Sequence, residues 1–190
     1  MITVALDRSP EDARPYIERA NPTHPALVDT EHVVAHRYGI INISTAVWID
    51  EAGRVVRPPA IEYGSDLFKA FHGRESKPHL DALRRWVREG ELPLAAEELA
   101  KRRLLPTREE QLARAEFALA WSLFRRGERE AAEKHFVRAG ELSPHDWTIR
   151  RGSMPIRGLD PMGADAAGLF QEWMEAGMPD YASLAKSRQG

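Results

Sequence analysis

Residues 45–56 read TAVWIDEAGRVV and predict a β-hairpin. The β-branched and aromatic residues of 45–49 suit a strand, residues 50–53 supply a short turn with glycine, and residues 54–56 return as a second strand. Arg57-Pro58-Pro59 follows, and we expect it to end the hairpin. This hairpin is the clearest strand pattern in the chain.

Upstream of the hairpin, the pattern alternates between strands and helices. Residues 2–6 (ITVAL) suit a short, buried parallel strand. A helix over residues 10–20 is expected next, with Ser9 as its N-cap and proline at its first position. A short strand over residues 26–28 and a helix over residues 30–38 complete this part, which predicts an α/β arrangement over residues 1–76.

Downstream of residue 77 the strand signals almost disappear and helical periodicity takes over. Helices are expected over residues 67–71, 78–88, 94–103, 107–126, 130–142, 167–176 and 181–186. We therefore expect a domain boundary near residues 73–77, a helical region over 77–146, and a final segment over 147–190. That last segment begins as an irregular stretch rich in Arg, Gly and Pro.

Composition excludes several classes of function. The 190 residues carry a net charge of −2, which gives no electrostatic footprint for a nucleic-acid or anionic-membrane partner. The absence of cysteine excludes disulfides, thiolate metal sites and a Cys nucleophile within this chain. No stretch approaches the roughly 18 apolar residues of a membrane span. We expect a soluble, cytoplasmic protein that contacts no membrane.

Residues 38–56 (YGIINISTAVWIDEAGRVV) resemble the second half of thioredoxin-fold proteins, in particular the TlpA/ResA-like branch. That family reads YGV…PT…IDE.GRIV through this stretch. The stretch around residues 4–12 looks like the family's second strand and helix, and residues 25–29 (PALVD) look like its P.L.D insertion. The resemblance covers residues 2 to about 90. It implies an α/β, thioredoxin-like fold, shortened at its N-terminus and followed by a helical extension.

Two departures from the family bear on function. The strand and helix that carry the family's CxxC would precede Met1, so this segment is absent from the chain. The family's cis-proline position is occupied by Ser44, and we expect the Ile43–Ser44 peptide bond to be trans, because a non-proline cis bond costs about 2.5–4 kcal/mol. The resemblance implies that Ile43, Ser44 and Thr45 lie in a loop that contacts a substrate or partner. A simpler interpretation is that Ser44 and Thr45 begin a strand, and both remain open.

The helical region carries a second resemblance, to a single tetratricopeptide repeat over residues 109–144. The residues at the spacing of the repeat are Leu119, Ala120, Leu123, Gly127, Ala132, Phe136, Ala139, Leu142 and Pro144. Glu116 stands where the repeat usually has a first-helix Trp. Because one repeat cannot bury its own apolar face, we expect the hairpin to pack on neighbouring elements.

Histidines and arginines are the candidate ligand-binding residues of this sequence. His32 and His36 are four residues apart on an expected helix, a spacing found in zinc sites, but no third ligand is indicated. Two solvated histidines are the simpler account, and we predict neither a metal site nor a cofactor. No phosphate-binding loop or nucleophile motif is present, so no catalytic residue is predicted.

Three arginines, Arg150, Arg151 and Arg157, lie in the irregular segment that begins at residue 147. Their guanidinium groups could bind a carboxylate or phosphate. The alternative, which we favour, is an extended strap across the α/β domain. In that arrangement the apolar residues pack inward and the arginines pair with Asp160 and with surface acids.

These observations favour a redox-inactive binding or scaffolding protein with a protein or peptide partner. The alternative is a fragment of a TlpA/ResA-like thiol–disulfide oxidoreductase whose redox segment lies upstream, so enzymatic activity is left open. A thioredoxin-like sheet without its central strand would leave the strands at 2–6 and 46–49 with unpaired edges. We therefore expect the chain to form a homodimer through these edges, to aggregate, or to be partly molten.

The lack of cysteine gives a first prediction. Thiol–disulfide exchange needs an attacking thiolate, and this chain has none. The purified chain should not accelerate the reduction of insulin by dithiothreitol beyond a heat-denatured sample of the same chain. Turbidity measures the reduction. A clear acceleration would require a chemistry that the sequence does not show.

Overall fold

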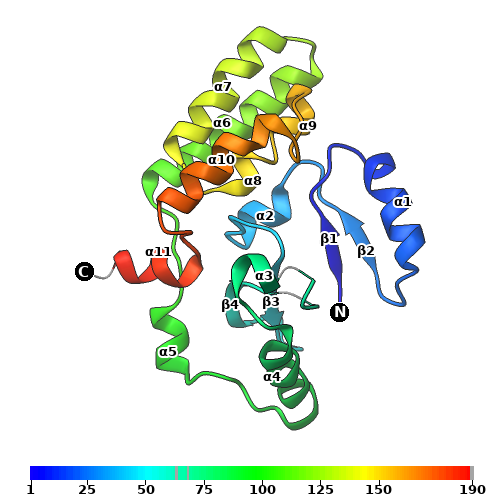
Figure 1. The fold of residues 1–190 in the computed structure, drawn as a ribbon, viewed down its shortest axis with the longest axis vertical. Coiled ribbons are helices and arrows are strands. Elements are labelled where there is room, and N and C mark those ends of the chain that lie inside the picture. The colour runs from blue at the N-terminus through cyan, green and yellow to red at the C-terminus, as the bar shows by residue number, and fades with distance from the viewer. Residues whose placement is uncertain (63, 68, 189–190) are drawn as a thin grey trace. The chain divides into compact units, whose positions relative to one another are not determined.

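The computed structural model describes residues 1–62, 64–67 and 69–188 of the chain (Figure 1). Helices hold 53% of the described residues and strands only 10%, so this part of the chain is mainly helical. Within the described part, the strands form two separate two-stranded sheets, β1–β2 and β3–β4. The predicted thioredoxin-like α/β fold is therefore wrong, because that fold needs one sheet in which a central strand joins the others.

The chain forms two compact units, each made from two stretches of sequence. Unit 1 contains Met1–Asn42 and Pro106–Met178, and unit 2 contains Ile43–Leu105 and Pro179–Gly190. The boundary expected near residues 73–77 falls inside unit 2. No helix in the described residues is both long enough and apolar enough to cross a membrane.

Unit 1 begins with the strand–helix–strand segment expected from sequence. β1 (Thr3–Ala5) pairs in parallel with β2 (Ala26–Val28), and α1 (Pro10–Ala20) connects them. The predicted N-cap is confirmed, since Ser9 Oγ accepts a hydrogen bond from Asp12 N at 3.3 Å. The predicted burial of the first strand is wrong, because Ile2 is 63% exposed. The homodimer through strand edges stays a prediction.

The next helix, α2 (Val33–Arg37), is shorter than the expected 30–38. The carboxylate of Asp29 accepts hydrogen bonds from Val33 N at 2.8 Å and Ala35 N at 3.0 Å, which fixes the start of the helix there. His32 precedes it in a left-handed conformation with φ of 56°, which no helical residue adopts.

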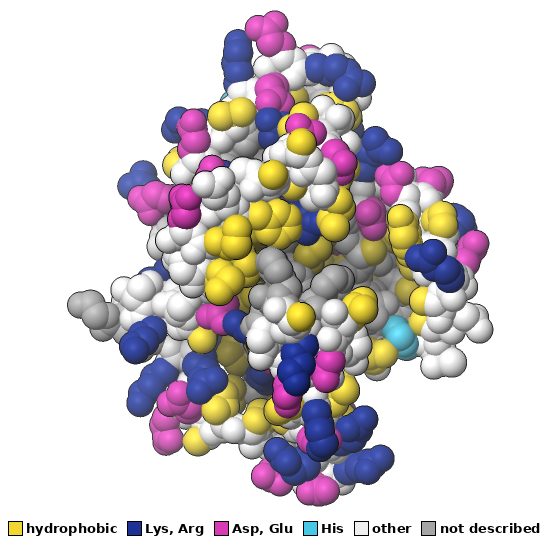
Figure 2. Space-filling model, in the orientation of Figure 1, with side chains coloured by type: hydrophobic (Ala, Val, Ile, Leu, Met, Phe, Trp, Pro, Cys, Tyr) yellow, Lys and Arg dark blue, Asp and Glu magenta, His cyan; other side chains and the backbone are white. Residues whose placement is uncertain are grey.

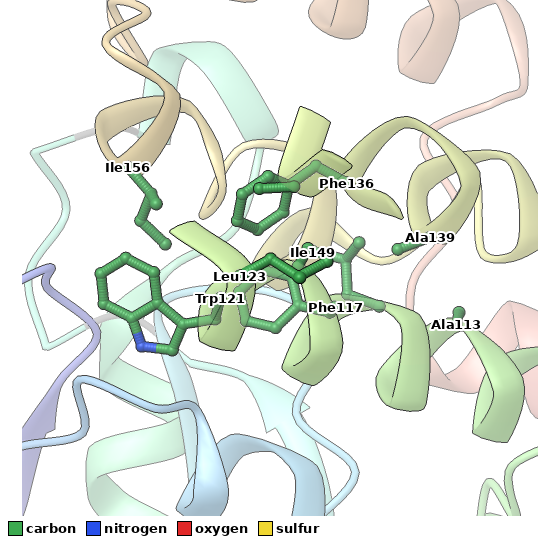
Figure 3. Close-up of a cluster of buried hydrophobic side chains, with 10 residues drawn as sticks. Ala113, Phe117, Trp121, Leu123, Phe136, Ala139, Ile149 and Ile156 are labelled. Atoms are coloured by element: carbon green, nitrogen blue, oxygen red, sulfur yellow. The ribbon is translucent and has the colours of Figure 1, made fainter. Parts of the chain in front are cut away.

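A helical hairpin forms the core of unit 1. The helices α6 (Arg108–Arg125) and α7 (Arg129–Leu142) are joined at Gly127, whose φ of 84° favours glycine. A capping box of Thr107 and Glu110 is present at the start of α6. Figure 3 shows the cluster of buried side chains built on this hairpin. Its alanines, which let the two helices approach closely, are Ala113, Ala120, Ala132 and Ala139.

The segment after α7 is helical where an extended strap was expected, so that expectation is wrong. It contains α8 (Trp147–Arg150), α9 (Met154–Arg157) and α10 (Ala164–Glu175). The inward packing of its apolar residues is confirmed, since Ile149, Met154 and Ile156 are buried. Ile149 and Ile156 pack into the α6–α7 cluster rather than onto an α/β domain (Figure 3).

Unit 2 is built on the predicted hairpin, in which β3 (Thr45–Ile49) pairs antiparallel with β4 (Val55–Ile61). The expectation that residues 57–59 end the second strand is wrong. The pairs Ala46↔Ala60 and Trp48↔Arg57 leave one more residue between them on β4 than on β3. This irregularity, on a strand with one unpaired edge, accommodates Pro58 and Pro59.

The remaining elements of unit 2 are all helices. They are α3 (Lys69–His72), α4 (Ser76–Glu89), α5 (Ala96–Lys101) and α11 (Tyr181–Ser187). The expected helix over 67–71 includes Phe68, which lies outside the described residues. Gly90 ends α4, because it adopts a left-handed conformation with φ of 73° and caps the helix.

The helical hairpin gives a second prediction. Ala132 on α7 is 1% exposed, so Ala132→Leu should overpack the contact with α6 and lower the free energy of unfolding by roughly 1–3 kcal/mol. Ala118→Leu is the matched control, because Ala118 lies on an exposed position of α6. Urea unfolding midpoints measure both variants. Equal midpoints would contradict the observed packing register.

Candidate functional site

A polar pocket in unit 2 lies beside β4 and the start of α11. The residues that line it are Arg57, Pro58, Pro59, Ala60, Ile61, Glu62, Arg74, Leu94, Arg102, Asp180, Tyr181 and Ala182. Three arginines and two carboxylates therefore meet in one hollow. This gathering of charged groups makes the pocket a candidate site for a charged ligand.

Glu62 lies at the centre of a packed ionic and aromatic cluster. It forms an ion pair with Arg57 Nη2, and its Oε2 lies 2.9 Å from His79 Nδ1. The Arg57 guanidinium lies 4.9 Å from the centroid of the Trp48 ring, which is stacked on Trp86. Burial raises the pKa of Glu62, but its contacts with His79 and Arg57 outweigh burial and leave the pKa below its ordinary value.

Asp180 supplies the second carboxylate and also begins α11. Its Oδ1 accepts a hydrogen bond from Ser183 N at 2.9 Å, while Ser183 Oγ accepts one from Asp180 N at 2.8 Å. Its Oδ2 forms an ion pair with Arg74. Burial raises the pKa of Asp180, but the Ser183 N–H and Arg74 outweigh burial and lower the pKa below its usual range. Asp180 therefore stays ionised at neutral pH.

The residues predicted from the family resemblance lie next to this pocket. Thr45 Oγ1 is 3.0 Å from the hydroxyl of Tyr181, and Ser44 O accepts a hydrogen bond from Glu62 N at 3.0 Å. Ile43 is 55% exposed. The Ile43–Ser44 peptide bond is cis, so the expectation of a trans bond is wrong. Thr45 also begins β3, in agreement with the simpler interpretation.

Sequence reasoning missed most of the residues that line the pocket. The pattern Asp180-x-x-Ser183 is a capping-box spacing and could have identified Asp180. No sequence pattern identifies Glu62, since its contacts with Arg57 and His79 depend on the return of β4 and the placement of α4. No sequence pattern identifies Arg102 either, because it lines the pocket with residues of β4 that are far from it in the sequence.

The three arginines predicted as an anion site do not converge on one point. Arg150 forms an ion pair with Glu172 at 2.6 Å, and Arg157 forms one with Glu133. Arg151 Nε donates a hydrogen bond to Pro161 O at 2.7 Å. The expected pairing with surface acids is confirmed by Glu172 and Glu133. Asp160 instead accepts a hydrogen bond from Met162 N at 2.8 Å.

The two histidines weighed as metal ligands lie in different environments. His36 is exposed, as expected, but His32 is only 4% exposed and packs on Phe117 with 4.7 Å between ring centroids. The expectation of two solvated histidines is therefore wrong for His32. Burial and the nearby Arg114 lower the pKa of His32 to about 4. In the described part of the chain, no group of three His, Cys, Asp or Glu residues could hold a metal ion.

A buried ion pair lies close to His32. Arg114 on α6 pairs with Asp146, and its Nη2 also donates a hydrogen bond to Ile40 O at 2.6 Å. Asp146 accepts hydrogen bonds from Thr148 N at 2.9 Å and Ile149 N at 3.1 Å, at the start of α8. Burial raises the pKa of Asp146 against the attraction of Arg114. Arg114 Nη2 and the Asp146 carboxylate have partners within unit 1, whereas Arg114 Nη1 is buried without a hydrogen-bond partner.

No protein-family model, curated protein or solved structure matches this chain. The geometry of the pockets therefore carries the functional argument. Figure 2 shows acidic and basic side chains interspersed over the visible face, in agreement with the near-neutral net charge.

The environment of His32 gives a third prediction. Its pKa is about 4 in the folded state and about 6.5 when unfolded, so the unfolded chain binds more protons between these values. The stability present above pH 6.5 should therefore be lost as the pH falls toward 4, by roughly 3 kcal/mol at most from this group. Urea unfolding at several pH values measures this loss.

The control for this prediction is a pair of substitutions. His32→Asn keeps a residue that tolerates the left-handed conformation and should flatten the loss of stability between pH 6.5 and 4. His145→Asn, at an exposed loop position, should leave the pH profile unchanged. A His32→Asn profile parallel to that of the unmodified chain would show that His32 is not the titrating group.

Proposed function

We propose that this protein is a non-catalytic binding or scaffolding protein whose unit 2 pocket binds an acidic segment of a protein partner. The observation that carries the proposal is the pairing of both pocket carboxylates. Glu62 and Asp180 are each held by an arginine, and each has a pKa below its ordinary value. A carboxylate in that state is a poor general base or acid near neutral pH, and it suits a fixed recognition surface.

The charges of the pocket favour an acidic partner. Arg57 and Arg74 are engaged by Glu62 and Asp180, which leaves Arg102 as the third cation. Arg102 follows α5 and pairs with Glu98 at 3.2 Å, but both side chains are close to half exposed. Exposed ion pairs of this kind contribute little, so a partner carboxylate can replace Glu98 at small cost. The guanidinium group then binds that carboxylate through two parallel hydrogen bonds.

The other pocket residues suit an extended polypeptide. Pro58 and Pro59 present rigid apolar rings along β4, and Leu94 and Tyr181 also line the pocket. An extended segment that carries a carboxylate can place its side chain at Arg102 and pack its backbone along these residues. This combination supports a peptide ligand over a small polar metabolite.

The fourth prediction tests this function. Short peptides displayed on phage and selected on the full chain should be enriched in Asp and Glu. Arg102→Gln should weaken the selected peptides by about tenfold in a fluorescence polarisation assay, because one charged contact is lost.

The matched control is Arg84→Gln on α4. Arg84 is also exposed and also pairs with a carboxylate of its own helix, Asp81 at 3.0 Å, but it does not line the pocket. This variant should bind the peptides as the unmodified chain does. Selection of peptides without acidic residues, or equal losses in the two variants, would contradict the proposal.

A further inference from the structure

A second pocket lies in unit 1, between the loop that precedes α8 and one side of α10. Its walls are mostly apolar and include Pro144, Trp147, Leu169, Trp173 and Ala176. The Trp147 and Trp173 rings meet edge to face, with 5.7 Å between centroids. The cavity volume is about 180 Å³, below the usual range for drug-sized ligands, so the pocket suits only a small ligand.

One cation lines this apolar pocket. Arg150 is fixed from one side, because its Nη1 donates a hydrogen bond to Pro144 O at 3.2 Å. Its Nη2 lies 2.6 Å from Glu172 Oε2, on α10. The Arg150 side chain is 23% exposed, whereas that of Glu172 is 60% exposed. The guanidinium group is therefore held in place, and its acidic partner is a well-solvated side chain.

We propose that this pocket binds a small apolar monocarboxylate. The apolar part of the ligand packs against Trp147, Trp173 and Leu169, and its carboxylate takes the place of Glu172 on Arg150. The exchange conserves the number of ion pairs. It releases the Glu172 carboxylate to water, where it is already mostly solvated, and it fills an apolar space.

The three arginines in the segment after residue 147 differ in their relation to this pocket. Arg157 also pairs with a glutamate, Glu133, but it does not line the pocket. Arg151 donates a hydrogen bond to the backbone at Pro161 and lies over Phe170, 5.7 Å from its ring centroid. Of these three arginines, only Arg150 is among the residues that line the pocket.

Octanoate is a suitable probe, with octanamide as the uncharged control of the same length. Octanoate should bind the full chain and change its tryptophan fluorescence, and octanamide should bind at least about tenfold more weakly. Arg150→Gln should reduce octanoate binding to the octanamide level. Glu172→Gln should strengthen octanoate binding several-fold, because it removes the competing carboxylate. Arg157→Gln should change nothing.

The same chemistry is present at the C-terminus of a polypeptide that ends in an apolar residue. A short peptide ending in leucine, with a free or an amidated terminus, distinguishes that source from a small molecule. Preference for octanoate supports the small-molecule site as proposed. Binding of the free-terminus peptide with no binding of octanoate would overturn it.

Three further outcomes would also overturn the proposal. They are equal binding of octanoate and octanamide, octanoate binding that survives Arg150→Gln, and weaker binding in Glu172→Gln. Circular dichroism and thermal unfolding of each variant show whether it is folded. If Arg150→Gln does not fold, the Glu172→Gln variant and the comparison with octanamide still test the proposal.

Discussion

The buried ion pair between Arg114 and Asp146 is the interaction on which unit 1 depends. This unit is assembled from two stretches of chain, and Arg114 bonds to both through Ile40 O and Asp146. Trp147 N donates a second hydrogen bond across the same junction, to Ile41 O at 2.8 Å. Burying two charges costs desolvation free energy. Removing one partner of a buried pair destabilises the fold by roughly 3–5 kcal/mol, because the other charge is left unpaired. The pair thus links the N-terminal segment to the helical hairpin.

The same carboxylate also places the pocket of unit 1. Asp146 caps α8, which carries both Trp147 and Arg150. Close packing extends from α8 to α2 at Gly152. A Cβ there would lie 2.1 Å from Thr148 O and 2.9 Å from His32 Cε1, so only glycine lets His32 approach so closely. The buried histidine, the ion pair and the end of α8 therefore form one contiguous packed region.

Local features of this fold were predictable from sequence, and long-range assembly was not. Ser9, the Thr107–Glu110 box and Gly127 affect only residues that are close to them in sequence. Their effects can therefore be predicted from the local sequence. The hairpin over residues 45–56 was also predictable, but its sequence does not determine which other strands pair with its two outer edges. The resemblance built on it therefore predicted a single sheet where the chain forms two separate strand pairs. The contacts of Glu62 and His32 were missed for the same reason.

Arginines that look alike in sequence differ here by the exposure of their partners. The partners of Arg57 and Arg74, Glu62 and Asp180, are 13% and 22% exposed in their side chains, so these pairs are part of the pocket wall. Glu172, which pairs with Arg150, is 60% exposed and readily returns to water. Desolvation decides the difference, because a half-buried carboxylate that loses its cation is left without compensation, whereas an exposed one is resolvated. An arginine is thus available to a ligand when its present partner is itself well hydrated, as Glu98 and Glu172 are.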